Sequence, residues 1–232
     1  MDAYGGAKDS RAERGMSEDF RFGRHYDVHE LVADGIVHGV GVVLALIGVT
    51  ALIFYATVFT SYGEIAAAWI YGLGLVTALA ASFTYNMWPR SRTKAYLRRL
   101  DHSAIFLLIA ATYTPFLQRG ADEWGLLALL LGIWAIAAGG IFIKWRFPGR
   151  YDRLCILLYL AMGWSGMIAA GPISERLPPM AMALIVIGGV LYSTGVIFHV
   201  WQRLRFQNAI WHGFVVVAAA VHYSAVLISL GA

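Results

Sequence analysis

Seven long, mostly apolar stretches constrain this chain more than any other feature of its sequence. A helix needs roughly 20 apolar residues to cross the hydrocarbon core of a bilayer, which is about 30 Å thick. Stretches of that length predict helices at roughly 31–58, 63–86, 101–118, 123–143, 153–173, 179–201 and 208–230. Only 14% of the residues are charged, whereas a soluble domain carries about a quarter. The sequence therefore predicts an all-α membrane protein built as a bundle of seven transmembrane helices.

The first 30 residues differ from the rest of the chain because they carry mixed charge and no apolar core. They do not look like a signal peptide, which contains an apolar segment. We therefore expect two parts, a polar cytoplasmic tail at 1–30 and a seven-helix domain at 31–232. Cys155 is the only cysteine, so no disulfide can form within the chain.

Basic residues indicate how the helices are oriented. All but two of the 18 Lys and Arg residues lie in the tail or close to the loops that follow the second, fourth and sixth stretches, and the two exceptions are Arg119 and Arg176. Short loops rich in Lys and Arg stay cytoplasmic, which predicts a cytoplasmic N-terminus and an outside C-terminus. The same loops account for the net charge of +4 and suit anionic lipid headgroups. We expect membrane lipids as partners, and no nucleic acid.

Polar side chains from five of the stretches are predicted to lie at one depth, near the cytoplasmic side. They are His38, Ser82, Asn86, Asp101, His102, His199, Asn208 and His212. Within this set, two pairs are spaced four apart on a helix, so that each pair faces one direction. His222 is about 15 Å deeper than His212 and is expected to face the same interior. Ionisable groups inside a membrane are costly and tend to mark function, so we interpret the convergence as a candidate site.

Most of these residues also have a purely structural interpretation, which for His38 and His199 is packing near the membrane interface. Ser82, Asn86 and Asn208 can form hydrogen bonds that hold helices together. Asp101 can cap the N-terminus of the third helix, and His102 points about 100° away from it, toward headgroups or a neighbouring helix. Small residues at 72–74, 137–140 and 187–195 predict close approach of helices rather than a phosphate loop.

Several motifs together resemble a known family. In chain order they are DGIVHGVG, SFTYN, LRRLDHSAIFLLIAATYTPF, FPGRYDR, GVIFH and NAIWHGFVVVAAAVHYSAV. They resemble the bacterial hemolysin III proteins, which belong with the progestin and adipoQ receptors, including the adiponectin receptors. The resemblance covers residues 31–230, and it implies a multi-pass protein of the bacterial cytoplasmic membrane.

The resemblance also implies a zinc site near the cytoplasmic side, held by three histidines. A serine and an aspartate complete it, and their positions here are Ser82 and Asp101, which would carry the catalytic role. His212 matches one zinc ligand. The other two ligand positions are occupied by Asn86 and Asn208, so two of the three implied ligands are missing.

The implied activity is hydrolysis of amide bonds in lipids such as ceramides, by water that zinc activates. A catalytic zinc site normally has three protein ligands, and an asparagine amide is a weak one. We therefore expect zinc binding to be severely weakened, so that no cofactor is assigned, unless Asp101, His199 or His222 replaces a missing ligand. The polar network of Asn86, Asn208 and His222 then remains as a lipid pocket.

Three functions stay open at this point. The favoured one is a lipid-binding protein of the hemolysin III type with a degraded zinc site. The second is an active lipid amide hydrolase with rearranged metal ligands. The third is a channel-forming or cytolytic protein, which no charged stripe along any stretch supports.

Overall fold

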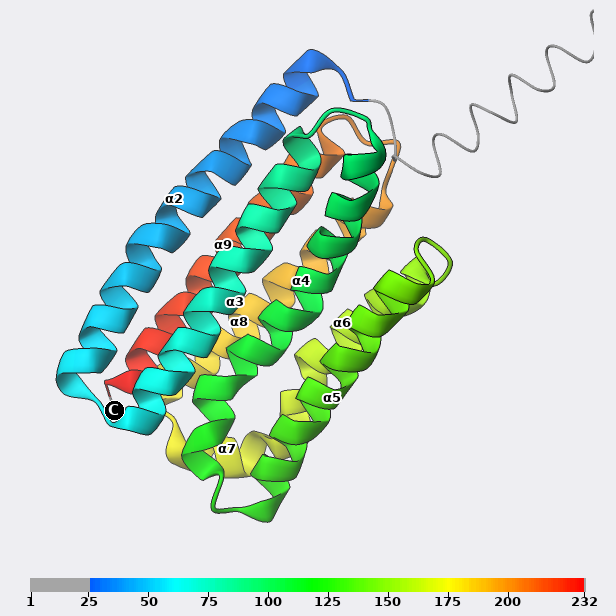
Figure 1. Cartoon of the computed structure of the whole chain (residues 1–232). Coiled ribbons are helices and arrows are strands. Elements are labelled where there is room, and N and C mark those ends of the chain that lie inside the picture. Colours follow the sequence, from blue (N-terminus) through cyan, green and yellow to red (C-terminus); the bar gives the residue numbers. More distant parts are fainter. Residues whose placement is uncertain (1–25, 232) are drawn as a thin grey trace, which may run out of the picture.

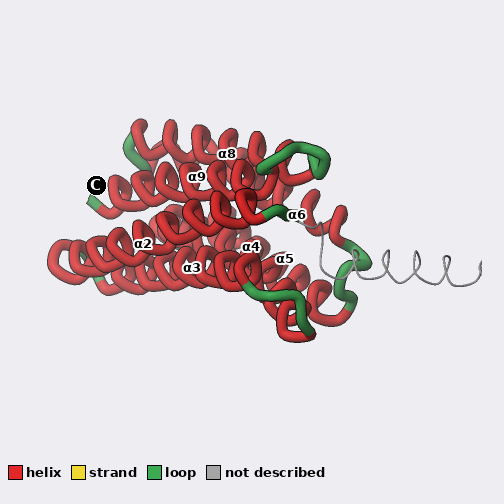
Figure 2. The backbone as a smooth tube through the Cα atoms, turned by 90° about the horizontal axis from the view of Figure 1, so that it is seen from above, coloured by secondary structure: helices red, strands yellow, loops and turns green. Residues whose placement is uncertain are grey.

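Helices form all of the regular structure in the part of the chain that the structure describes, residues 26–231 (Figures 1 and 2). The structure is a computed structural model. The helices are α2 (Val28–Phe59), α3 (Tyr62–Met87), α4 (Arg92–Leu117), η1 (Gln118–Gly120), α5 (Trp124–Arg146), α6 (Asp152–Trp164), η2 (Ser165–Ala169), α7 (Ala170–Arg176), α8 (Pro179–Val200) and α9 (Gln207–Leu230). Most of the predicted tail lies outside the described residues.

Within residues 26–231, seven helical segments are long and apolar enough to cross a membrane. They are α2, α3, α4 with η1, α5, α6 through α7, α8 and α9. This confirms the seven predicted spans and the all-helical fold class. The direction in which they cross stays a prediction, because length and composition alone do not set it.

The third span begins nine residues earlier than predicted, at Arg92 instead of residue 101. Ser91 caps it, because its hydroxyl accepts a hydrogen bond from the backbone N–H of Lys94 at 3.2 Å. Basic residues in the first two turns hid this start from a hydropathy criterion. Asp101 therefore lies well inside α4, and its interpretation as an N-cap is wrong.

The fifth span is not one continuous helix. After α6, the chain passes through the 3-10 segment η2 into α7. Tyr113 of α4 reaches this break, where its hydroxyl donates to the carbonyl of Gly163 at 2.7 Å and accepts from the N–H of Gly166 at 2.9 Å. A side chain from another helix thus replaces hydrogen bonds that the interrupted helix lacks.

One end of the bundle carries the basic loops, and we call it the basic end: α2, α4, α6 and α9 begin there, and α3, α5 and α8 end there. At this end α2 starts with a capping box between Asp27 and Glu30. The backbone N–H of Glu30 holds the pKa of the Asp27 carboxyl below its usual value. Glu30 also accepts from the N–H of Phe206 at 3.0 Å, so the first turns of α2 and α9 are tied together.

The helices pack in a sequence that brings the first and last described helices, α2 and α9, side by side. α3 packs between α2 and α4, and α9 packs against both α8 and α2, while α5 contacts α4 (Figures 1 and 2). α6 makes few close backbone contacts with any other helix. The outer surfaces of the helices expose large apolar side chains, as expected for a surface in lipid.

Glycines allow the closest helix contacts. A Cβ on Gly140 of α5 would lie 2.2 Å from the ring of Phe106 on α4, and a Cβ on Gly188 of α8 would lie 2.2 Å from the ring of His222 on α9. Neither space admits a methyl group. Both glycines belong to the small-residue stretches, so the prediction of close helix approach there is confirmed.

Candidate functional site

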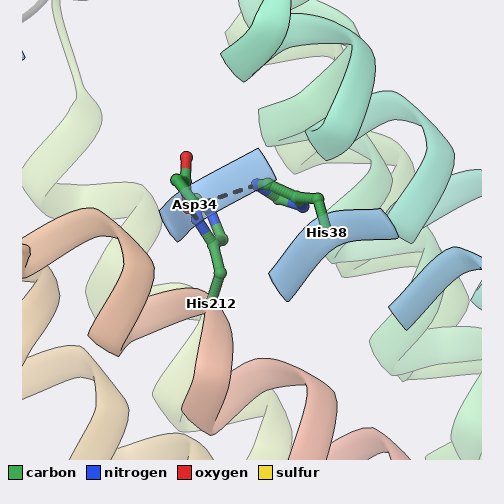
Figure 3. A group of neighbouring side chains, drawn as sticks. All are labelled: Asp34, His38 and His212. Carbon is green, nitrogen blue, oxygen red and sulfur yellow. Dashed lines mark hydrogen bonds and ion pairs between the residues drawn. The ribbon is translucent and has the colours of Figure 1, made fainter. Parts of the chain in front are cut away.

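A carboxylate and two imidazoles meet inside the bundle, near the basic end (Figure 3). Asp34 and His38 come from α2, and His212 comes from α9. Asp34 Oδ1 lies 2.7 Å from His212 Nδ1 and 3.7 Å from His38 Nε2. The two imidazole rings have centroids 4.1 Å apart. All three residues are buried, with 3%, 2% and 6% of their surface exposed for Asp34, His38 and His212.

Helical spacing on α2 explains two of the three members of this group. Asp34 and His38 are four residues apart, so they share one face of the helix. Ile36 and Val40, which are more than half exposed, point the other way. Sequence reasoning named His38 but missed Asp34, although an acidic residue inside an apolar span is itself a functional signal. The spacing of Asp34 and His38 can be read from the segment DGIVH. Their contact with His212 on α9 cannot be read from the sequence.

Three polar residues extend the group toward α3 and α9. Asn208 Nδ2 donates to Asp34 Oδ2 at 2.7 Å and to Asn86 Oδ1 at 2.9 Å. Asn86 Nδ2 donates to the backbone carbonyl of Ser82 at 2.9 Å. The Ser82 hydroxyl lies 3.4 Å from His212 Nε2. The structure therefore joins Ser82, Asn86, Asn208 and His212 into one network, with Asp34 at its centre.

Asp101 borders this network from α4. It is buried and lies near both Ser82 and His212. Its neighbour His102 belongs to a different group, because His102 Nδ1 lies 3.2 Å from Lys144 Nζ. Lys144 in turn donates to Asp152 Oδ1 at 2.7 Å. Adjacent residues on α4 thus serve two separate polar clusters, as their angular separation on a helix predicts.

Two other histidines that the sequence suggested for the site, His199 and His222, do not enter the network. His199 packs its ring against Trp211, with centroids 5.0 Å apart. His222 bonds through Nε2 to the backbone carbonyl of Ile185 on α8, at 3.1 Å. Neither lies in the group of Asp34, His38 and His212. The histidines that the sequence offered as replacement ligands are therefore placed elsewhere in the bundle.

A cavity of about 2190 Å³ opens onto the network. Its polar end contains Asp34, His38, Ser82, Asp101 and His212. Farther from the basic end, its walls are formed by α4, α6, α8 and α9, with Ile109, Leu160, Ile185 and His222 among the lining residues. Pockets for drug-sized ligands measure about 300–1,000 Å³, so this cavity is large enough for a lipid.

The fold and the site define a class of protein, a multi-pass membrane protein of seven helices with a buried polar site near one end of the bundle. The Haemolysin-III related family model matches residues 26–223. This chain belongs to that family, and the resemblance seen in its motifs is confirmed.

Individual relatives agree with the family match. The chain is 36% identical over 202 residues to the Hemolysin-3 homolog of Bacillus subtilis (strain 168), covering 87% of this chain and 95% of the relative. It is 37% identical over 203 residues to Hemolysin-3 of Bacillus cereus, covering 86% and 91%. It is 32% identical over 167 residues to the human Monocyte to macrophage differentiation factor, covering 68% of each chain.

The family resemblance implies zinc at the positions of Asn86, Asn208 and His212, and their chemistry can be compared with that role. The three residues lie close together, since Asn208 bonds to Asn86 and both border His212 through Asp34 and Ser82. Their donors are one imidazole and two neutral amides. The NH₂ group of Asn208 faces the other members of the network, and an NH₂ group donates hydrogen bonds and cannot ligate a cation. These three positions do not fit zinc, which favours imidazole, thiolate and carboxylate.

Proposed function

We propose that this protein binds a membrane lipid in its cavity. The headgroup would lie against the polar network around Asp34 and Asn208, and the acyl chain would lie between α4, α6 and α8. The observation that carries this proposal is the lining of the cavity, which includes the polar network together with apolar side chains of α4, α6 and α8. Sites for small ligands combine apolar walls with a few placed polar groups in the same way.

The proposal includes the loss of the three-imidazole zinc site that the family resemblance implies. Asn86 and Asn208 act as hydrogen-bonding residues that hold Asp34 in place beside the headgroup. We further propose that the basic end faces the cytoplasm, because short loops rich in Lys and Arg stay on that side.

A pair of substitutions on α6 tests the lipid site. Leu160 lines the cavity, whereas Leu157 points outward with 64% of its surface exposed. Leu160→Trp should fill the space of the acyl chain and weaken binding of a fluorescent ceramide to the purified protein by at least about tenfold, which corresponds to about 1.4 kcal/mol. Leu157→Trp adds the same bulk to the outer surface and should leave binding unchanged. Equal binding by the parent protein and both variants would refute the proposal.

A second candidate function is hydrolysis of an amide bond in the bound lipid. It is favoured by the buried group of Asp34, His38 and His212 at the polar end of the cavity, since hydrolysis of lipids needs groups that activate water there. Release of fatty acid from ceramide by the purified protein, abolished by Asp34→Asn, would support this function. If the parent protein binds ceramide but releases no fatty acid, hydrolysis is refuted and lipid binding remains as the proposed function.

A further inference from the structure

One nitrogen in the buried group lacks a hydrogen-bond partner. His38 Nε2 is buried and bonds to no other group among the described residues. Asp34 Oδ1 lies 3.7 Å from it, which is too long for a hydrogen bond. A buried polar atom left unsatisfied costs about 1–3 kcal/mol, and a bound ion is one way to satisfy it.

The unpaired nitrogen points at two other potential ligands. His38 Nε2 is directed toward Asp34, and His212 approaches Asp34 from α9 (Figure 3). Donor atoms of all three residues lie within 4.8 Å of one another. In a tetrahedral zinc site with bonds of about 2.0–2.1 Å, neighbouring ligand atoms are about 3.3 Å apart. The observed separations of 3.7 Å and 2.7 Å bracket that value, and the third separation is no more than 4.8 Å, so small movements of the side chains complete the arrangement.

We propose that Asp34, His38 and His212 bind a zinc ion, at a site displaced from the one that the family resemblance implies. Two imidazoles and one carboxylate form a normal set of three protein ligands for zinc that also binds water. Asp34 and His38 both come from α2, which contributes nothing to the implied site. All three residues line the cavity, so the site lies next to the space that a lipid would enter.

The surrounding hydrogen bonds suit this role. Metal ligands are usually held by outer partners that fix their orientation. Asp34 uses Oδ1 toward the two imidazoles, and its Oδ2 accepts from Asn208 at 2.7 Å. When His212 binds the ion through Nδ1, its Nε2–H can donate to the Ser82 hydroxyl, which lies 3.4 Å away. Asn208 thereby changes from an implied ligand to a residue that orients one.

Metal analysis of the full-length protein tests the site without any lipid. The protein should be purified through a tag that contains no histidine, in buffer without chelator, and its zinc measured by plasma mass spectrometry. We expect close to one zinc per chain in the parent protein. Asp34→Asn, His38→Gln and His212→Gln should each lower this at least fivefold. His199→Gln and His222→Gln remove histidines outside the group and should retain the zinc.

Two further variants separate this site from the implied one. Asn86→Ala should keep its zinc, because Asn86 is no ligand in the displaced site. In the double variant Asn86→His with Asn208→His, the two new imidazoles and that of His212 can hold the ion together. Adding His38→Gln to this variant should therefore no longer release it. Thermal unfolding in detergent, with and without added zinc, shows whether each variant is folded, and zinc should raise the melting temperature only where it binds.

The outcomes decide the proposal. Iron in place of zinc, with the same pattern among the variants, would support the site and change the metal, since two imidazoles and a carboxylate also hold iron. A folded parent protein that neither purifies with a metal nor binds added zinc at micromolar concentration would overturn it. So would zinc that is lost in Asn86→Ala and kept in His38→Gln. Failure here leaves the lipid-binding test on α6 unaffected, because that test measures ceramide and not metal.

Discussion

Gly188 and Gly189 are neighbours on α8, but only one of them faces a ring on α9. A Cβ on Gly188 would lie 2.2 Å from Cδ2 and 2.3 Å from Nε2 of His222. A Cβ on Gly189 would meet nothing nearer than Trp164, at 3.6 Å, which is ordinary contact. Changing either glycine to alanine gives the same gain in helix propensity, about 1 kcal/mol. The difference between the two variants therefore measures the contact with His222.

The size of that difference follows from two costs. The His222 ring must move, and forcing atoms into a packed interior costs about 1–3 kcal/mol. Moving the ring also breaks its bond to the carbonyl of Ile185, and hydrogen bonds between membrane helices are worth about 0.6–1.7 kcal/mol. We expect Gly188→Ala to be less stable than Gly189→Ala by about 2–4 kcal/mol.

Reversible unfolding of the purified variants in mixed detergent micelles measures this difference. A double-mutant cycle adds a sharper control, because in a His222→Ala background the ring is absent and Gly188→Ala should lose most of its cost. The coupling between the two positions should then reach about 1–3 kcal/mol, as found for residues in contact. Equal stability of the two alanine variants, or additive effects of Gly188→Ala and His222→Ala, would show that the helices do not pack as described.

Three further predictions concern orientation, the site and the break in the fifth span. A cysteine at Ala121 should react with a membrane-impermeant maleimide on intact cells and one at Thr93 should not, and the reverse would overturn the proposed orientation. Asp101→Ala should lower the free energy of unfolding by about 1–3 kcal/mol, because it leaves buried partners unsatisfied. Asp122→Ala breaks only an exposed ion pair and should cost about 0–1 kcal/mol, so equal losses would make Asp101 a surface residue. Tyr113→Phe should speed amide exchange at 163–169, since it removes two hydrogen bonds there, and unchanged exchange would mean that the break is held by other contacts.

The seven spans and the glycine contacts were predictable from the sequence because they depend on local composition. Apolar length sets the number of crossings, and a glycine allows close approach wherever its helix packs. Where basic side chains begin a helix, as in the first turns of α4, hydropathy placed the boundary too late. Tyr113 of α4 hydrogen-bonds to the chain at the break in the fifth span, and this contact could not be read from residues 153–173 alone.

The candidate site also has features that the sequence predicted and features that depend on tertiary packing. Depth along each helix follows from the sequence, and it predicted that Ser82, Asp101 and His212 share one end of the bundle. Which faces meet depends on how the helices are arranged around each other, and 3.6 residues per turn give each helix many faces that could turn inward. Only the tertiary structure could therefore bring Asp34 and His38 of α2 against His212 of α9, leave His199 and His222 outside the group, and turn Asn208 toward Asp34.

The sequence by itself determined a seven-helix membrane protein with polar residues gathered at one end, because burial in lipid acts on each segment separately. The packing of the helices decided which of those residues touch, because such contacts join segments that are far apart in the chain.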